Sequence, residues 1–220
     1  MIKVCAVLHR RPDLGVEEFQ EYWRTTHAAL VAKVPGVRGY VQSHPRLSGY
    51  KRGPLPFDGL AEVWADDTQA LRAMAASPEL QAVRRDEPNF LDTERLDELI
   101  VDEVVIKDGP VAPVKNIELV RFRTDLPTEE ADRYWREVHG PIAAAIPTVR
   151  RYVQSHLRPA AYRRDEPPLC DGLAITWFES VDAMRESARS DEYARTRADE
   201  PNFLPPGDPD TVIATEHVIV

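Results

Sequence analysis

The spacing of apolar residues over the first 36 positions predicts a strand followed by a helix. Residues 2–9 are mostly apolar and partly β-branched, which is typical of a strand. From 16 to 34, large side chains recur at steps of three and four, which places them on one face of a helix. These side chains belong to Phe19, Trp23, His27, Leu30 and Val34. The following Pro-Gly pair ends the helix.

The rest of the first half predicts five further elements. Alternating side chains and a second apolar run indicate two strands, two capped amphipathic segments indicate helices, and a final β-branched run indicates a strand. The predicted ranges are 37–44 and 59–65 for the strands, 68–76 and 78–85 for the helices, and 99–107 for the last strand. This βαββαβ order is typical of a ferredoxin-like unit, in which helices cover one face of an antiparallel four-stranded sheet.

The second half of the chain repeats the first. The segment PGVRGYVQSH at 35–44 returns as PTVRRYVQSH at 147–156, and DEPNFL at 86–91 returns unchanged at 199–204. The repeat predicts strands at 117–123, 149–156, 172–178 and 212–220, and helices at 128–146 and 180–198. We therefore expect two domains, 1–109 and 110–220, with 107–113 as the linker because it contains Gly and Pro.

A sheet covered by helices on one side leaves its second face bare. An exposed apolar sheet face needs a cover, and the sheet of the other copy can supply it. Symmetric homodimers do the same between chains. We therefore expect an α+β protein in which two ferredoxin-like units pack sheet to sheet, an intramolecular pseudo-dimer. Further assembly into homo-oligomers stays open.

Composition restricts the partners and the location. The 220 residues are 43% hydrophobic and 30% charged, which is typical of globular proteins. The net charge is −9 and no long basic run occurs, so we do not expect nucleic acid as a partner. No apolar stretch reaches about 18 residues, and the N-terminus lacks the apolar core of a secretory signal. Cys5 and Cys170 are not at equivalent repeat positions, so we expect no disulfide framework and a cytoplasmic location.

Three blocks carry a family resemblance. Tyr22-Trp23-x-x-x-His27, then DGLAEVW at 58–64 and DEPNFL at 86–91, resemble the EthD family of the dimeric α+β barrel superfamily. Its members are usually single units that dimerise, so the resemblance implies two such units fused in one chain. Some fungal relatives are cofactor-independent dehydratases of aromatic polyketide pathways, which implies a reaction only loosely because fold does not settle function. The second copy, with His139-Gly140-Pro141-Ile142, is closer to the family's usual H-x-P-[LI] form than the first copy.

Two histidines, His27 and His139, are the candidate catalytic residues. Each lies on the inward stripe of a helix, four residues after a tryptophan, and each stays in place where neighbouring core residues differ between copies. Such a histidine is either a hydrogen-bonded core residue or a general acid–base, because imidazole titrates near neutrality. Asp58 and Asp171 precede a glycine at a strand start, so they either cap a loop or orient a histidine.

The candidate substrate-binding residues surround these histidines in both copies. They are Tyr22, Trp23, Tyr40, Gln42, His44 and Phe90 in the first, and Tyr134, Trp135, Tyr152, Gln154, His156 and Phe203 in the second. The Tyr-x-Gln-x-His line is either a polar pocket lining or a surface that pairs the two sheets. Phe90 and Phe203 also fit a structural turn that packs an aromatic ring.

These residues predict an enzyme that needs no cofactor. We expect His-mediated proton transfer on a small apolar, aromatic or polyketide-like substrate, in the class of a lyase (dehydratase) or an isomerase/cyclase. The alternatives are a non-catalytic small-molecule-binding protein and an accessory subunit of an oxidase system. No metal motif or nucleotide motif occurs, and a metal site built from His27, His44 and Asp58 would need three separate elements to converge. Haem stays open because relatives in the superfamily carry one.

Overall fold

The computed structural model describes residues 1–163 and 165–220, and its first half follows the predicted order of strands and helices. The elements are β1 (Ile2–Leu8), α1 (Val16–Tyr22), η1 (Trp23–His27), α2 (Ala28–Val31), β2 (Gly39–Pro45), β3 (Gly59–Ala65), α3 (Thr68–Ala75), α4 (Pro78–Asp86) and β4 (Asp97–Lys107). Asp67 and Ser77 cap α3 and α4, since their side chains accept backbone N–H groups of the first turn.

The second half has the same order. Its elements are β5 (Val114–Val120), α5 (Thr128–Tyr134), η5 (Trp135–His139), α6 (Gly140–Ala144), β6 (Arg151–Leu157), β7 (Gly172–Phe178), α7 (Val181–Ser187), α8 (Asp191–Asp199) and β8 (Asp210–Val218). The two predicted βαββαβ units are therefore confirmed.

All pairings between the strands of a unit are antiparallel. In the first unit β3 lies between β1 and β2, and the beginning of β4 pairs with the other edge of β1. In the second unit β7 lies between β5 and β6, and β8 pairs with β5. The hydrogen-bonded order of the eight strands, β1-β3-β2-β8-β5-β7-β6-β4, closes on itself, which confirms the barrel expected from the resemblance.

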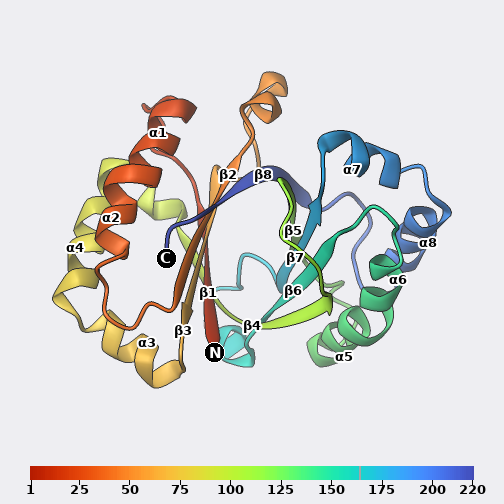
Figure 1. Cartoon of the computed structure of the whole chain (residues 1–220). Coiled ribbons are helices and arrows are strands. Elements are labelled where there is room, and N and C mark those ends of the chain that lie inside the picture. Colours follow the sequence, from red (N-terminus) through yellow and green to blue (C-terminus); the bar gives the residue numbers. More distant parts are fainter. Residues whose placement is uncertain (164) are drawn as a thin grey trace. The chain divides into compact units, whose positions relative to one another are not determined.

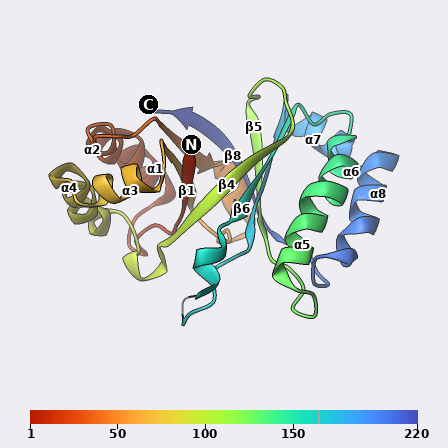
Figure 2. The same ribbon diagram turned by 90° about the horizontal axis from the view of Figure 1, so that it is seen from below.

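Helices cover one face of the sheet in each unit. Figure 1 shows α1, α2, α3 and α4 on the same side of β1, β2 and β3. Figure 2 shows α5 and α6 following one another along one helix, with α8 beside it, against the strands of the second unit. The compact units are residues 1–101 with 215–220, and residues 102–214. The end of the chain therefore belongs to the first unit, where Ile219 N–H donates to the Tyr40 carbonyl over 2.8 Å.

Several predicted elements differ in detail, and three of the differences have a local cause or a local signature. The helix expected over 16–34 contains a π-helical turn, η1, that apolar spacing alone does not reveal. The strand expected at 117–123 lies three residues earlier, because Phe122 N–H leaves the sheet to bond Asp171 Oδ2 over 2.7 Å. The helix expected over 180–198 is two helices, since Ser190 caps the second one by accepting Tyr193 N–H.

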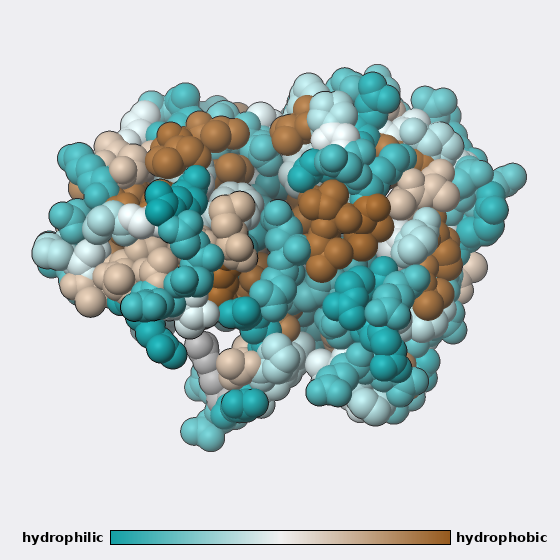
Figure 3. All heavy atoms as spheres, turned by 60° about the horizontal axis from the view of Figure 1, so that its bottom comes forward, coloured by the Kyte–Doolittle hydropathy of each residue, from teal (hydrophilic) through white to brown (hydrophobic). Residues whose placement is uncertain are grey.

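Each unit has its own core between helices and sheet. In the first, Phe19, Trp23 and Phe90 are fully buried, and the first two rings lie 5.8 Å apart. Gly59 leaves room for this packing, because a Cβ there would lie 2.6 Å from the Trp23 ring. The viewed surface is mostly hydrophilic with separate apolar patches (Figure 3). No helix in the described ranges is long and apolar enough to cross a membrane.

Candidate acid–base site in each unit

The π-helical turn η1 holds the two residues of the repeated Trp-x-x-x-His motif at its ends. Ala28 N–H donates to the Trp23 carbonyl five residues before it, and that carbonyl also accepts Gln42 Nε2–H over 2.8 Å. Trp23 and His27 are both buried. The second unit repeats the arrangement, with Gln154 Nε2 3.0 Å from the carbonyl of Trp135. Single π turns inside α-helices occur often at functional sites.

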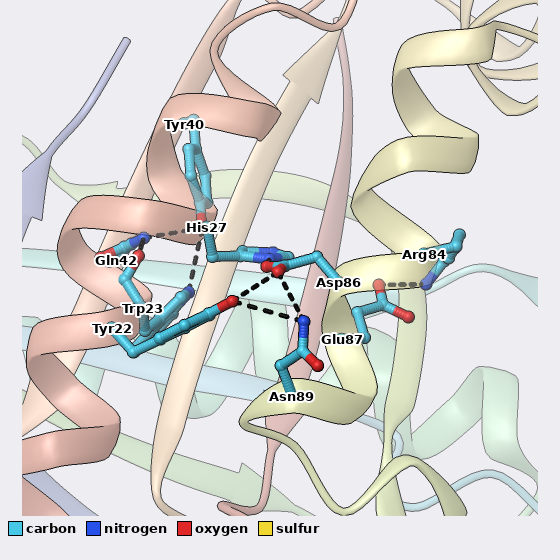
Figure 4. Close-up of polar contacts among 9 residues, drawn as sticks. All are labelled: Tyr22, Trp23, His27, Tyr40, Gln42, Arg84, Asp86, Glu87 and Asn89. Atoms are coloured by element: carbon cyan, nitrogen blue, oxygen red, sulfur yellow. Dashed lines mark hydrogen bonds and ion pairs between the residues drawn. The ribbon is translucent and has the colours of Figure 1, made fainter.

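A carboxylate on α4 contacts the first histidine. His27 Nδ1 lies 2.9 Å from Asp86 Oδ2. The other oxygen of Asp86 accepts the Tyr22 hydroxyl over 2.6 Å and the Asn89 amide over 3.0 Å. Figure 4 shows all four side chains converging between the first helix and α4. Each Asp86 oxygen therefore has at least one donor, which suits an ionised carboxylate.

The second unit reproduces this cluster almost without change. His139 Nδ1 lies 2.9 Å from Asp199 Oδ2, and Tyr134 donates to Asp199 Oδ1 over 2.6 Å. Asn202 bonds both Asp199 and the Tyr134 hydroxyl. The same four residue types keep the same geometry although the core around them differs, for example at Phe19 and its counterpart Ala131.

We call each histidine–aspartate pair, His27–Asp86 and His139–Asp199, a dyad. The charges of the dyad define which nitrogen of the histidine is free. Burial acts to raise the pKa of Asp86, but the bonds from Tyr22, His27 and Asn89 outweigh it and lower the pKa below its usual value. Burial lowers the pKa of His27 despite its bond to Asp86, so the ring is neutral at neutral pH. An ionised Asp86 can only accept, so His27 carries its proton on Nδ1. Nε2 is left with a lone pair, and no described residue bonds it.

His27 faces a cavity of about 90 Å³ between the helices and the sheet of the first unit. Its wall is largely apolar and includes Ala6, Val31, Val63, Met74 and Leu80. The polar side chains at the wall are few: Tyr40, His27, Arg84, Glu87 and Glu98. A concave apolar site with a few converging polar groups is the usual form of a small-molecule site.

Glu87 is the second titratable group at this wall. It follows Asp86 directly, in the short helical segment η3 (Glu87–Asn89), and Arg84 donates to it over 2.9 Å. Burial raises the pKa of Glu87 to about 7, although the charge of Arg84 opposes the shift. Glu200 in the second unit has the same partner type, Arg197, and its pKa is also raised by burial to about 7.

Sequence reasoning missed Asp86, Glu87 and Arg84 as site residues. The available signal was the block DEPNFL, which is identical in both copies, but its Asn-Phe pair was interpreted as a structural turn that packs an aromatic ring. The block also forms a turn, because its residues Glu87–Asn89 make up η3, the short helical segment that follows α4. The block therefore supplies the site carboxylates and the turn together.

Asp58 and Asp171 do not orient the histidines. Asp58 accepts the backbone N–H of Arg10 over 3.0 Å and the Tyr50 hydroxyl over 2.8 Å. Asp171 makes the matching bonds to Phe122 and Tyr162. The predicted orienting role is corrected on this geometry: these residues secure the strand-entry loops, and a carboxylate on the α4 and α8 helices contacts the histidine instead.

The Tyr-x-Gln-x-His line of β2 divides between two places. Tyr40 lines the cavity and its hydroxyl accepts Trp23 Nε1–H over 3.0 Å. Gln42 is fully buried behind it, and Gln42 Nε2 donates to the same hydroxyl over 2.8 Å. His44 lies outside the cavity wall, stacked on Trp23 with ring centroids 4.4 Å apart. Gln154 and His156 are likewise buried in the second unit, where Gln154 donates to the Tyr152 hydroxyl over 2.9 Å.

The aromatic candidates pack beside the histidines. The ring of Phe90 lies 4.6 Å from that of His27, and the ring of Phe203 lies 4.7 Å from that of His139. Phe90 thus holds the imidazole from one side. Within the described ranges, no group of three or more His, Cys, Asp or Glu residues is placed to hold a metal ion. His27, His44 and Asp58 have separate partners.

The sequence blocks that form this site match a family model. The model for the EthD domain matches residues 11–94 and again residues 123–207. The chain belongs to the EthD family. Each match spans one first helix with its histidine and one Asp-Glu-Pro-Asn segment, so each EthD unit contains one complete dyad. No curated protein matches the sequence.

Solved structures resemble the chain as a whole or one EthD unit of it. An anthrone oxidase-like protein aligns with a TM-score of 0.63 at 12% identity, over 99% of this chain and 93% of its own. A chlorite dismutase variant from Candidatus Nitrospira defluvii aligns with a TM-score of 0.50 at 13% identity, over 99% and 92%. An EthD family protein from Bacillus halodurans is 30% identical over 47% of this chain and 99% of its own, with a TM-score of 0.39. The first two likenesses show the fold alone.

Proposed function

We propose that this EthD protein is an enzyme that moves a proton on a small apolar or aromatic carbonyl compound. His27 is the base and Glu87 is the acid in the first unit, and His139 and Glu200 take these roles in the second. The observation that carries the proposal is the His27–Asp86 contact at 2.9 Å beside an apolar cavity.

The dyad supports the role of a base. Asp86 fixes the proton on Nδ1 and orients the ring, so the lone pair on Nε2 is available to a substrate in the cavity. The lowered pKa of His27 keeps this nitrogen unprotonated near neutral pH. When Nε2 takes a proton from a substrate carbon, the ionised Asp86 stabilises the imidazolium that forms.

The acid role rests on Glu87. Its pKa, raised by burial to about 7, keeps much of the side chain protonated at neutral pH. A protonated carboxyl at the cavity wall can donate its proton to the carbonyl oxygen while Nε2 removes a proton from the adjacent carbon. The product is the enol, the atoms balance, and the reverse transfers return the ketone.

The cavity wall supports an apolar substrate. Aliphatic side chains form most of it, and Trp23 and Tyr40 add two aromatic rings. An aromatic ring ligand suits these contacts. The resemblance to an anthrone oxidase-like fold fits an aromatic ketone, a class in which carbons next to the carbonyl carry acidic protons.

The two units are not identical at this wall. Ala6 and Glu118 occupy equivalent register positions, because each pairs with the alanine of its Gly-Leu-Ala strand. Glu118 accepts Asn116 Nδ2–H over 2.8 Å, and burial raises its pKa. A carboxyl therefore stands in the second unit where the first has a methyl group, so we assign the more apolar substrate to the first unit.

The test uses 1-indanone, a small aromatic ketone, in D2O. We expect the protein to accelerate exchange of the protons next to the carbonyl, followed by proton NMR. The double variant His27→Ala/His139→Ala should lower the rate by about 10²–10⁴. His9→Gln is the matched control, since His9 bonds neither dyad, and it should leave the rate unchanged.

Two results would contradict the proposal. The first is exchange at the full rate in the double variant while its melting temperature is unaltered. The second is saturable binding of the ketone without any acceleration of exchange, which would favour a non-catalytic binding protein. The first result would show that the histidines do not carry the rate, and the second would separate binding from catalysis.

A further inference from the structure

A second hollow in the first unit is separate from the cavity that His27 faces, which we call the acid–base cavity. It has a volume of about 410 Å³ and lies beside the end of β2, and we call it the basic groove. Its polar lining consists of Gln20, His44, Arg46, Ser48, Thr215 and His217. None of these residues lines the acid–base cavity. Trp23 separates the two, because it lines the cavity and stacks on His44.

The orientation of His44 is fixed by its neighbours. Gln42 donates through Nε2 to the Trp23 carbonyl and to the Tyr40 hydroxyl, so its Oε1 is the acceptor. His44 Nε2 lies 2.9 Å from that oxygen and therefore carries a hydrogen. His44 Nδ1 has no hydrogen-bonding partner among the described residues. The edge of His217 packs against the same ring, with centroids 4.7 Å apart.

The second unit shows what satisfies this nitrogen. There, His156 Nε2 bonds Gln154 over 3.0 Å in the same way, and His156 Nδ1 lies 2.6 Å from Asp132 Oδ1. Asp132 is the repeat counterpart of Gln20. The Gln20 amide does not take over this role, because it donates to the Pro45 carbonyl over 2.8 Å.

The two units also differ at the position of a second carboxylate. Arg158, the counterpart of Arg46, forms an ion pair with Asp102 over 3.1 Å. In the first unit, Thr215 stands at the register position that Asp102 has in the second unit. The second unit thus closes its histidine and arginine with two internal carboxylates, and the first unit lacks both.

We infer that the basic groove binds the carboxylate group of a small organic acid, which occupies the place that the Asp132 side chain fills in the second unit. Both nitrogens of His44 then act as donors, as both nitrogens of His156 contact acceptors. Ser48 and Thr215 offer hydroxyls, and Arg46 offers a cation, to the second carboxylate oxygen. The site stands on its own residues and does not depend on the proposed proton-transfer activity.

Binding is coupled to a proton because His44 Nε2–H is already committed to Gln42. Burial, together with the charges of His217 and Arg24, lowers the pKa of His44 to about 3, so the free groove holds a neutral ring. Burial and Arg24 also lower the pKa of His217, against the opposing charge of Glu216. A bound carboxylate favours the charged ring, so about one proton is taken up with each anion.

Benzoate and benzyl alcohol form a matched pair of probes that differ in charge. We expect calorimetric titration of the whole chain at pH 6 to show saturable binding of benzoate to one site, at least about tenfold tighter than benzyl alcohol. Titrations in two buffers of different ionisation enthalpy should show uptake of about one proton, and affinity should weaken as the pH rises to 8.

Gln20→Asp should abolish this binding, because it supplies the internal carboxylate that the second unit has. Gln20→Asn, which keeps the amide, is the matched control and should retain the affinity. Asp86→Asn should also retain it, since Asp86 lies in the other site, so loss of catalysis and loss of anion binding are distinguishable. Absence of saturable benzoate binding, or unchanged benzoate affinity in a folded Gln20→Asp variant, would overturn the inference.

Discussion

The substitution Asp86→Asn tests the dyad with the smallest change in shape. If the asparagine oxygen keeps the bonds to Tyr22 and Asn89, its NH2 group faces His27 Nδ1. A donor at that place requires Nδ1 to be the acceptor, so the proton moves to Nε2. The variant then has a correctly placed ring in the wrong tautomer, and the base is lost.

The expected effects on stability and on rate differ widely in size. The bond to His27 is replaced, and the bonds from Tyr22 and Asn89 lose their ionised acceptor. Together these changes cost about 2 kcal/mol of unfolding free energy. That corresponds to a fall of about 4–8 °C in the melting temperature if all 220 residues unfold together. Native domains have about 5–15 kcal/mol, so the variant stays folded at 25 °C. A drop in rate of about 10²–10⁴ would therefore come from the site itself.

The assay is exchange of 1-indanone protons in D2O by the double variant Asp86→Asn/Asp199→Asn, together with a thermal melt. The double variant is needed because each unit has its own dyad. Each single variant should retain the activity of the other unit and serves as the internal control. Exchange at the wild-type rate in the folded double variant would refute the reasoning, since neither histidine would then depend on its carboxylate.

Two further predictions concern pH and packing. The exchange rate should fall at acidic pH, where His27 becomes protonated below its lowered pKa, and fall again above about pH 7, where Glu87 ionises. In the Asp199→Asn background, which isolates the first unit, Glu87→Gln should remove the alkaline fall from the pH–rate profile. An unchanged profile would count against Glu87 as the acid. Gly59→Ala should destabilise the protein by about 1–3 kcal/mol in denaturant unfolding, because its Cβ would lie 2.6 Å from the Trp23 ring, whereas Gly15→Ala meets nothing within 4 Å and should be nearly neutral.

The sequence was sufficient for the fold because two regularities in it are physical ones. The spacing of Phe19, Trp23 and His27 reflects burial of one helix face, and the repeat showed that the second half must fold in the same way. Local chemistry decided the details that differed. Ser190 ends one helix and begins the next through a side-chain cap, without the proline that marks the same boundary at Pro78.

The site was predictable only in part. His27 and His139 stood out because they stayed fixed on an inward stripe while their neighbours changed. Asp86 did not, since the contact that gives it a role spans 59 positions along the chain and depends on how α4 packs on the first helix. Asp58 attracted attention by its place before a glycine, but a loop cap produces the same pattern.

The basic groove was hidden for a similar reason. Gln20 and Asp132 are exposed-helix residue types whose difference has no meaning until His44 and His156 are placed beside them. Only the comparison of the two units within one chain shows that a carboxylate is present in one copy and absent in the other.

Nitrogen-15 NMR of the histidine side chains at pH 7.5 tests the central claim most directly. It distinguishes a protonated ring nitrogen from one with a lone pair, without any substrate. The dyads predict that His27 and His139 are neutral, with the proton on Nδ1 and the lone pair on Nε2. Protonated Nε2 in both residues at this pH would contradict the account, because neither ring could then accept a proton from a ligand in the cavity.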